Sequence, residues 1–312
     1  YGIGEGAPFE FVTGETLETA ITTAQLLGNR IIGQNPLNIE GIHEIMDKTI
    51  VGNTAAKAAI DIALYDLIGK HMNAPLYQVL GGYSNSFLTD VTIGIDTPET
   101  MANEAKDRVA QGFSILKIKA GLNPEQDIEA IKQIREAVGS SIRLRMDANQ
   151  GWTVSDAVKV MNGVEKYQVE AVEQPLPSWD IDGMAYVRKK VPIPVIADES
   201  VHSPRDAYQV AKKQAADVIN IKLMKSGGLY KAMSINNIAE AAGIQCMVGC
   251  MLESKIAITA GASLVAAKKN ITEADMDSFL YVKDIGINGG IQLDHGKITL
   301  PERPGLGIDL DM

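Results

Sequence analysis

Short runs of β-branched and apolar residues alternate with longer amphipathic stretches from about residue 90 onward. The short runs predict strands, and the longer amphipathic stretches predict helices. Eight strands are expected, at residues 91–95, 115–119, 142–148, 169–174, 194–198, 218–223, 245–249 and 271–276.

The stretches between these strands carry helix start and stop signals. One begins with Thr97 as a cap and Pro98 in the first position, and it ends at Gly112. The stretch 123–139 repeats this formula, with an Asn-Pro start and a glycine at its end. Further helices are expected at residues 155–167, 178–190, 203–213, 226–243 and 253–268.

This alternation predicts a parallel sheet, either doubly wound or closed into a barrel. Eight units over about 190 residues fit a barrel better, so we predict an α/β fold with a (β/α)7β TIM-type barrel over residues 91–280. The eighth strand lacks its own helix, because residues 281–312 are rich in turns and short strand-like runs. Residues 1–90, with a helical run at 54–72, predict a separate α+β piece that residues 281–312 rejoin.

Composition and charge narrow the class of partner. The net charge of −10 over 312 residues argues against nucleic acid or an anionic membrane surface. No apolar run approaches the ~18 residues of a membrane-spanning helix, and no signal peptide is visible, so a cytoplasmic location is expected. Cys246 and Cys250 share one expected strand, with Cα atoms ~13 Å apart, which is too far for a disulfide.

Three consecutive strands end in a carboxylate. Asp147 stands in MDAN, Glu173 in VEQP and Asp198 in ADES. In parallel barrels the carboxyl ends of the strands carry the chemistry, so these groups are expected to converge. Each alone is compatible with a cap or a loop entry, but unpaired together they would repel one another. An all-oxygen trio with room for water and substrate predicts a Mg²⁺ site.

Three lysines flank this predicted metal site. Lys117 and Lys119 leave the second strand by the same face, and Lys222 lies on the sixth strand, diametrically opposite. A substrate carboxylate on the metal would have Lys119 on one face of its α-carbon and Lys222 on the other. Two bases on opposite faces imply racemisation or epimerisation. The Lys117 ammonium and the dication would both lower the pKa of Lys119, and Lys117 would help to hold the developing enolate.

Seven short motifs carry a resemblance to a known family: KIK, MDAN, VEQP, ADES, NIKLMKSGG, CMVGC and ADMD. With them the chain resembles the muconate-lactonizing subgroup of the enolase superfamily, and most closely its dipeptide epimerases. The similarity runs over the whole chain, from the GEGAP opening through PLYQVLGGY at residues 75–83. A lysine base with Mg²⁺ is a well-known pattern of this superfamily.

The resemblance implies roles for further residues. It implies that Asp275 and Asp277, in the eighth unit, bind the α-ammonium of a dipeptide, since two carboxylates suit a cation. Thr92 matches a substrate-contacting position. So does the segment 250–252, made up of Cys250, Met251 and Leu252. The resemblance also implies a capping domain, built from the N- and C-terminal segments, that closes over the barrel mouth, and a homo-oligomer.

Members of the subgroup carry a further segment before GEGAP, with the first capping strands and a mobile loop that reads the second amino acid. The sequence begins after that point. We expect the segment to belong to the whole protein, since its loss would open the site to water and remove substrate contacts. The second residue of the dipeptide is therefore not predicted.

The leading hypothesis is a Mg²⁺-dependent epimerase of L-Ala-D/L-Glu or a similar dipeptide, as in breakdown of cell-wall peptides. The same site could instead serve an N-acylamino acid racemase, an o-succinylbenzoate synthase or a muconate cycloisomerase. The substrates of these enzymes lack a free ammonium, so the pair Asp275 and Asp277 discriminates between them and a dipeptide epimerase. A mandelate-racemase-like site would need a histidine at the seventh strand, where Gly249 and Cys250 stand. Two alternatives come from other classes of protein. One is a Schiff-base aldolase that uses Lys222 as its covalent amine, and the other is a non-catalytic, metal-stabilised binding protein.

Overall fold

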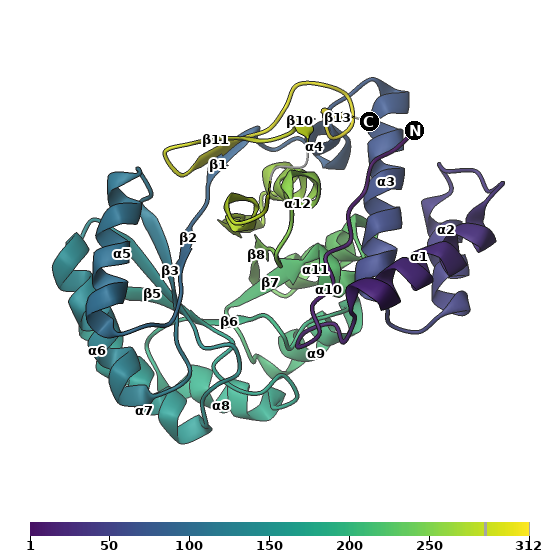
Figure 1. Cartoon of the computed structure of the whole chain (residues 1–312). Helices are drawn as coiled ribbons and strands as arrows, with labels where there is room; N and C mark the ends of the chain where they lie inside the picture. The colour runs from purple at the N-terminus through teal and green to yellow at the C-terminus, as the bar shows by residue number, and fades with distance from the viewer. Residues whose placement is uncertain (284–285, 312) are drawn as a thin grey trace.

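Eight strands, β2 to β9, run in chain order around a barrel in a computed structural model that describes residues 1–283 and 286–311 (Figure 1). They are β2 (Val91–Ile93), β3 (Ile115–Lys119), β4 (Arg143–Asp147), β5 (Val169–Glu173), β6 (Val195–Ala197), β7 (Val218–Lys222), β8 (Gln245–Gly249) and β9 (Ile271–Asp275). Each neighbouring pair is parallel. Asp90 N donates to Ala274 O over 3.3 Å, which links the last strand to the first. The predicted barrel is confirmed.

Seven helices cover the outside of the barrel, as the sequence predicts. They are α5 (Pro98–Ala110), α6 (Pro124–Val138), α7 (Val154–Val164), α8 (Ile181–Lys190), α9 (Pro204–Lys213), α11 (Leu229–Ala241) and α12 (Lys255–Ala267). The predicted caps form: Thr97 Oγ1 accepts a hydrogen bond from Thr100 N, and Asn123 Oδ1 accepts one from Gln126 N.

One helix prediction was wrong at its start. The single helix expected over residues 226–243 is divided into α10 (Leu223–Ser226) and α11, with Gly227 and Gly228 between them at φ 80° and 107°. Asp61, from the N-terminal part of the chain, inserts at this break and accepts hydrogen bonds from Leu229 N and Tyr230 N. A Cβ at Gly228 would lie 2.2 Å from Asp61 Oδ2, so the break admits only glycine without rearrangement.

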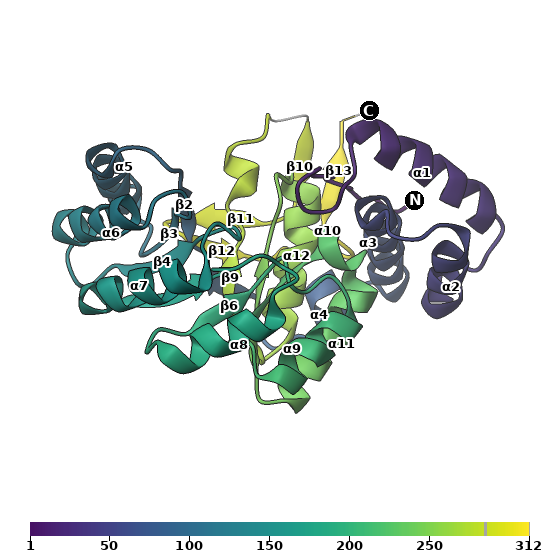
Figure 2. The same cartoon turned by 90° about the horizontal axis from the view of Figure 1, so that it is seen from below.

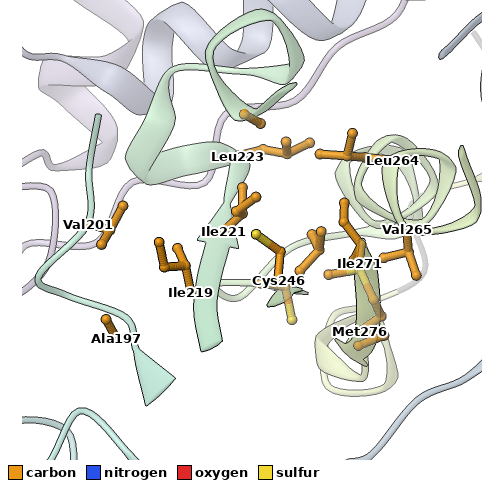
Figure 3. Packing of buried hydrophobic residues seen from close by; sticks show 14 of the residues in the cluster. Ala197, Val201, Ile219, Ile221, Leu223, Cys246, Leu264, Val265, Ile271 and Met276 are labelled. Carbon is orange, nitrogen blue, oxygen red and sulfur yellow. The ribbon is translucent and has the colours of Figure 1, made fainter. Parts of the chain in front are cut away.

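The two faces of the barrel strands differ in chemistry. Outward-facing side chains such as Ile221, Cys246 and Ile271 lie in one buried cluster with Leu264 and Val265 of α12 (Figure 3). The inner face carries buried charges as well as apolar side chains. Toward the amino-terminal ends of the strands these charges form ion pairs, which join Arg145 to Asp90 at 3.1 Å, and Arg143 to Glu170 at 2.6 Å and Glu273 at 2.8 Å.

The residues before the barrel form helices at one side of it (Figures 1 and 2). They are α1 (Leu17–Ile31), α2 (Ile39–Thr49), α3 (Thr54–Met72) and α4 (Leu76–Leu80), followed by the strand β1 (Ser86–Leu88). The expected helical run at 54–72 is α3, whereas α1 and α2 were not predicted. A small core of Leu27, Ile42, Met46 and Leu64 joins α1, α2 and α3. No helix in residues 1–283 and 286–311 is both long and apolar enough to span a membrane.

Within residues 286–311, the C-terminal segment returns in four short strands. They are β10 (Ile287–Gly289), β11 (Gln292–Asp294), β12 (Lys297–Thr299) and β13 (Ile308–Leu310). β11 and β12 form a three-stranded antiparallel sheet with β1, and β10 pairs with β13. The β11–β12 turn at Gly296 contacts Phe113, just before β3, so this sheet lies at the amino-terminal end of the barrel. Asp284, Ile285 and Met312 of the expected return segment lie outside the described residues.

The N-terminal segment packs flat along α3 through alternate glycines. A Cβ added to Gly4 would lie 1.9 Å from Ala59 O. The contacts pair Gly2 with the carbonyl of Ala63, Gly4 with that of Ala59 and Gly6 with that of Ala55. Two extended residues rise ~6.6 Å and four helical residues ~6.0 Å, so the two periods match over this short length. This packing explains the glycine spacing of the opening motif.

We expect Gly4→Ala to lower the free energy of unfolding by about 1–3 kcal/mol, because the new Cβ overlaps the α3 backbone. Urea unfolding followed by circular dichroism measures this change. Gly28→Ala, within α1 where a Cβ meets nothing within 4 Å, is the matched control. The control should stabilise the protein by about 0.5–1 kcal/mol. Equal effects of the two substitutions would contradict the packing explanation.

Candidate active site

A cavity of about 520 Å³ opens at the carboxyl ends of the barrel strands. It is lined by Phe9, Phe11, Val12, Thr92, Lys117, Lys119, Asn149, Gln150, Glu199, Lys222, Cys250, Met251, Leu252, Asp275, Asp277, Ser278 and Tyr281. The lining includes the three lysines, the Asp275–Asp277 pair and all four weaker substrate contacts expected from the sequence. The three expected metal ligands are buried and contact the lining lysines.

Lys117 joins the expected metal ligands to the acidic pair of the eighth strand. Its Nζ lies 3.0 Å from Asp147, 3.0 Å from Glu173 and 2.7 Å from Asp275. Burial alone would lower the pKa of Lys117, but Asp147, Asp275 and Glu173 outweigh burial and raise it well above its ordinary value. Lys117 is therefore a fixed cation beneath the cavity.

Lys119 and Lys222 approach the cavity from opposite walls, since β3 and β7 lie four strands apart. Lys119 Nζ lies 2.8 Å from Asp147 Oδ2, the oxygen that Lys117 also contacts. Lys222 Nζ lies 2.8 Å from Asp198 Oδ2. Burial opposes the charged form of Lys222, but Asp198 outweighs it and the pKa of Lys222 is raised.

The three carboxylates at successive strand ends differ in their charge environment. Burial raises the pKa of Glu173 to about 8, and Asp147 adds to this effect more than Lys117 reduces it. For Asp147 the effect of burial is overcome by Lys117 and Lys119, and its pKa is lowered. Burial would raise the pKa of Asp198, but Lys222 and a second lysine, Lys225, outweigh burial and hold this pKa well below its ordinary value.

The donor set fits a hard divalent cation, because three buried carboxylates from consecutive strands supply only oxygen. Here ammonium groups supply the countercharge. Among the residues that the structure describes, the three groups whose ligand atoms lie within 4.8 Å of one another are Cys250, Asp275 and Asp277 in the same cavity, and not Asp147, Glu173 and Asp198. Burial, with Asp275 and Asp277 next, raises the pKa of the Cys250 thiol well above its ordinary value, so it is a neutral neighbour of the acidic pair.

The acidic pair itself is held at two points. Asp275 contacts Lys117, and Asp277 Oδ2 accepts a hydrogen bond from Thr92 N over 2.7 Å. Burial, reinforced by Asp275, raises the pKa of Asp277 to about 6. The pair therefore presents carboxylate oxygens to the cavity with one countercharge already in place.

Two buried residues that were not predicted from the sequence hold Asp198 in position. Lys225 Nζ lies 2.5 Å from Asp198 Oδ1 and donates to the carbonyl of the same residue. Gln174 Oε1 accepts hydrogen bonds from Asp198 N over 2.9 Å and Ser200 N over 3.1 Å. The available signal for Lys225 was its position three residues after Lys222 in KLMK, and for Gln174 its place in VEQP.

Other lining residues were also missed. Asn149 and Glu199 stand inside the MDAN and ADES motifs, so their positions were marked without a role being assigned. Phe9 and Phe11 follow the glycine segment, which runs along α3 toward α10 (Figure 1), where Ala7 N contacts Met224 Sδ at 3.2 Å. Nothing in their spacing distinguishes these two rings from ordinary loop residues.

Comparison with known proteins gives two family matches that together span most of the chain. Residues 1–81 match the N-terminal domain of the mandelate racemase / muconate lactonizing enzyme family. Residues 100–312 match the enolase C-terminal domain-like family.

Individual relatives align over nearly the whole chain. A hydrophobic dipeptide epimerase of Enterococcus faecalis is 52% identical over 98% of this chain and 87% of its own length. An L-Ala-D/L-Glu epimerase of Clostridium acetobutylicum is 45% identical, covering 99% and 87%. An N-succinyl-L-Arg/Lys racemase of Bacillus cereus is 42% identical, covering 99% and 84%. A solved dipeptide epimerase from Enterococcus faecalis, complexed with Mg and L-Leu-L-Tyr, superposes with a TM-score of 0.97 at 52% identity, over 99% of this chain and 88% of that one.

We expect Lys225→Met to lower the free energy of unfolding by about 3–5 kcal/mol, because it leaves the buried Asp198 carboxylate without one of its two cations. Lys213→Met is the matched control, since its ion pair with Asp182 at 2.6 Å is largely exposed. The control should change stability by less than about 1 kcal/mol. Urea unfolding of both variants measures the difference, and equal losses would show that Lys225 does not support Asp198.

Proposed function

Because this chain belongs to the mandelate racemase / muconate lactonizing enzyme family of the enolase superfamily, we propose that it is a Mg²⁺-dependent dipeptide epimerase. The reaction is proton transfer at the α-carbon of the C-terminal residue of a dipeptide such as L-Ala-D/L-Glu. The observation that carries the proposal is the acidic pair Asp275–Asp277, which faces the same cavity as the opposed lysines Lys119 and Lys222.

The metal-binding residues in this proposal are Asp147, Glu173 and Asp198. Bound there, Mg²⁺ would supply the countercharge that ammonium groups supply in this structure and would stabilise an enolate as a Lewis acid. Lys117 stays charged throughout, because it has carboxylates on three sides.

The two opposed lysines carry the proton. At the start of a turnover one of Lys119 and Lys222 is the neutral amine and the other the ammonium. The amine takes the α-proton from its face, and the ammonium gives a proton to the opposite face of the same carbon. The configuration inverts, and the two lysines exchange protonation states. The reverse reaction uses the same groups in the opposite order.

Substrate class follows from the acidic pair. An α-ammonium group between Asp275 and Asp277 would complete their charge balance, because Lys117 neutralises only one of them. A dipeptide bears that ammonium several bonds from the reacting carbon. An N-acylated amino acid lacks it and would leave Asp277 without a cation. The acidic pair therefore favours a dipeptide over the acylated substrate in the name of the Bacillus cereus relative.

The setting of the reaction is part of the proposal. Residues 1–90 and the return of residues 281–312 form the capping domain, and residues 91–280 form the catalytic barrel. The part of the capping domain that lies at the cavity and selects the substrate is the segment with Phe9 and Phe11, whereas its sheet of β1, β11 and β12 lies at the opposite, amino-terminal end of the barrel. We place the enzyme in the cytoplasm as a homo-oligomer, in breakdown of cell-wall peptides. The net charge of −10 supports a small-molecule substrate over a polyanionic partner.

In ²H₂O with Mg²⁺, we expect the α-proton of a dipeptide to exchange with solvent as the residue epimerises, measured by proton NMR and mass spectrometry. The panel includes L-Ala-L-Glu and L-Leu-L-Tyr. Chelation should abolish turnover and added Mg²⁺ restore it. Lys119→Ala and Lys222→Ala should each lower epimerisation by about 10²–10⁴-fold, because each removes one acid/base. Lys132→Ala, on the surface of α6, is the control. Undiminished turnover in chelator or in either variant would refute the mechanism.

Replacing Asp275 and Asp277 together by Asn should reduce kcat/KM for dipeptides by at least about 30-fold, because the substrate ammonium loses its charged partners. Thermal unfolding of the variant shows whether the fold is retained. N-acetylated dipeptides are the comparison substrates, and their turnover should not fall in parallel. Unchanged dipeptide turnover would remove the argument for a dipeptide.

A further inference from the structure

We propose that Asn149 is a positioning residue for the base Lys119, and that Glu199 holds the amide of Asn149 in the orientation this requires. The inference rests on the proposed epimerase function and assigns roles to two cavity residues beyond the metal ligands, the lysines and the acidic pair.

Three hydrogen bonds connect these groups. Lys119 Nζ donates to Asn149 Oδ1 over 2.8 Å, and Asn149 Nδ2 donates to Glu199 Oε1 over 3.1 Å. Asn149 N donates to Asp147 Oδ1 over 2.9 Å. The amide orientation is determined by its partners, because an ammonium needs the carbonyl oxygen and a carboxylate needs the NH₂ group. A flipped amide would lose both bonds.

The backbone at Asn149 is adapted to this position. Asn149 and Gln150 have φ values of 41° and 70°, so the chain turns sharply after β4. Asparagine is among the non-glycine residues that enter this left-handed region most readily. The turn keeps the Asn149 side chain beside Lys119, two residues beyond Asp147, which Lys119 also contacts.

Glu199 is suited to hold the amide. It directly follows Asp198, lines the cavity and is 6% exposed. Its Oε2 is buried and has no hydrogen-bond partner among residues 1–283 and 286–311, so the bond from Asn149 is the one that anchors this carboxylate. A carboxylate kept in this position accepts a charge-assisted bond that fixes the amide.

The consequence concerns the lone pair of Lys119. A neutral lysine amine has two N–H bonds and one lone pair in a tetrahedral arrangement. Asn149 Oδ1 accepts one N–H of Lys119 over 2.8 Å and Asp147 Oδ2 lies at the same distance, so these two acceptors restrict the orientation of the amine of a residue that lines the cavity. Lys222 has one side-chain partner in the described chain, Asp198. The Asn149 amide therefore orients the lysine on one face of the substrate, Lys119, and not the lysine on the other face, Lys222.

The test is face-specific hydrogen exchange. Each epimer is incubated in ²H₂O with Mg²⁺, and exchange without inversion is measured separately from epimerisation. Lys119→Ala first identifies the epimer whose α-proton Lys119 removes. Asn149→Gly removes the amide without backbone strain, and Asn149→Ala is the second variant in case the loop becomes disordered.

In both Asn149 variants we expect exchange at the Lys119 face to fall about 10-fold, as for the loss of one hydrogen bond to a reacting group. Epimerisation should fall in both directions, since each direction needs Lys119 as base or acid. Exchange without inversion at the Lys222 face should stay within about twofold of the unsubstituted protein, and KM should not change. Glu199→Ala should give the same asymmetry, and Glu199→Gln, which retains Oε1 as an acceptor, should recover most of the rate.

The control is Asn103→Ala, which removes the exposed hydrogen bond from Lys106 at 3.4 Å on the outside of the barrel. It should leave both faces unchanged. Equal loss at both faces in the Asn149 variants, or no loss at either, would overturn the inference. Failure of the unsubstituted protein to exchange either epimer would instead overturn the proposed function.

Discussion

The ammonium group of Lys117 is the contact on which the barrel mouth depends. Burying three carboxylates around one point is unfavourable unless each finds a cation, and Lys117 Nζ touches Asp147, Glu173 and Asp275 at once. This one cation therefore decides which carboxylates share a site. It ties the group expected to bind metal to the group expected to bind an ammonium. The position of the two functions relative to each other is thus set by a single buried side chain.

Carboxylates attach the N-terminal elements to the barrel by accepting hydrogen bonds from backbone N–H groups. Glu5 accepts from Ser254 N at 2.7 Å and Ala257 N at 2.9 Å, where α12 begins. Asp61 does the same at the start of α11, and Asp66 accepts from the N-terminal segment at Ile3 N, 2.9 Å away. A carboxylate at a helix start satisfies otherwise unpaired donors and complements the helix dipole. The N-terminal elements are therefore attached through α11 and α12, two of the helices that cover the outside of the barrel.

The features predicted from the sequence are those that recur from one β/α unit to the next. Side-chain contacts between neighbouring loops were missed. The strands could be read because their apolar runs recur, and Asp147 and its two counterparts because they recur at the same point of three units. Lys225 and Asn149 act through contacts between successive loops, and no periodicity marks such contacts. The helices α1 and α2 were missed because their small core forms only when α3 packs against them. The Gly227-Gly228 pair marks the break before α11 in the sequence, but its occupant, Asp61, could not be foreseen because it lies far away in the chain.

The alternate glycines along α3 match the helix over only a short length, because the repeat of the extended segment and the repeat of the helix differ slightly. Each extended step of two residues exceeds the helical step of four by ~0.6 Å, so coincidence lasts for a few contacts and is then lost. The segment leaves the helix after Gly6, and Phe9 and Phe11 follow within five residues at the cavity. Sliding by one residue would place Ile3 or Glu5 against the helix backbone, which leaves no room for a Cβ. The glycine spacing therefore fixes the position of the segment along α3, and with it the position of Phe9 and Phe11 at the cavity.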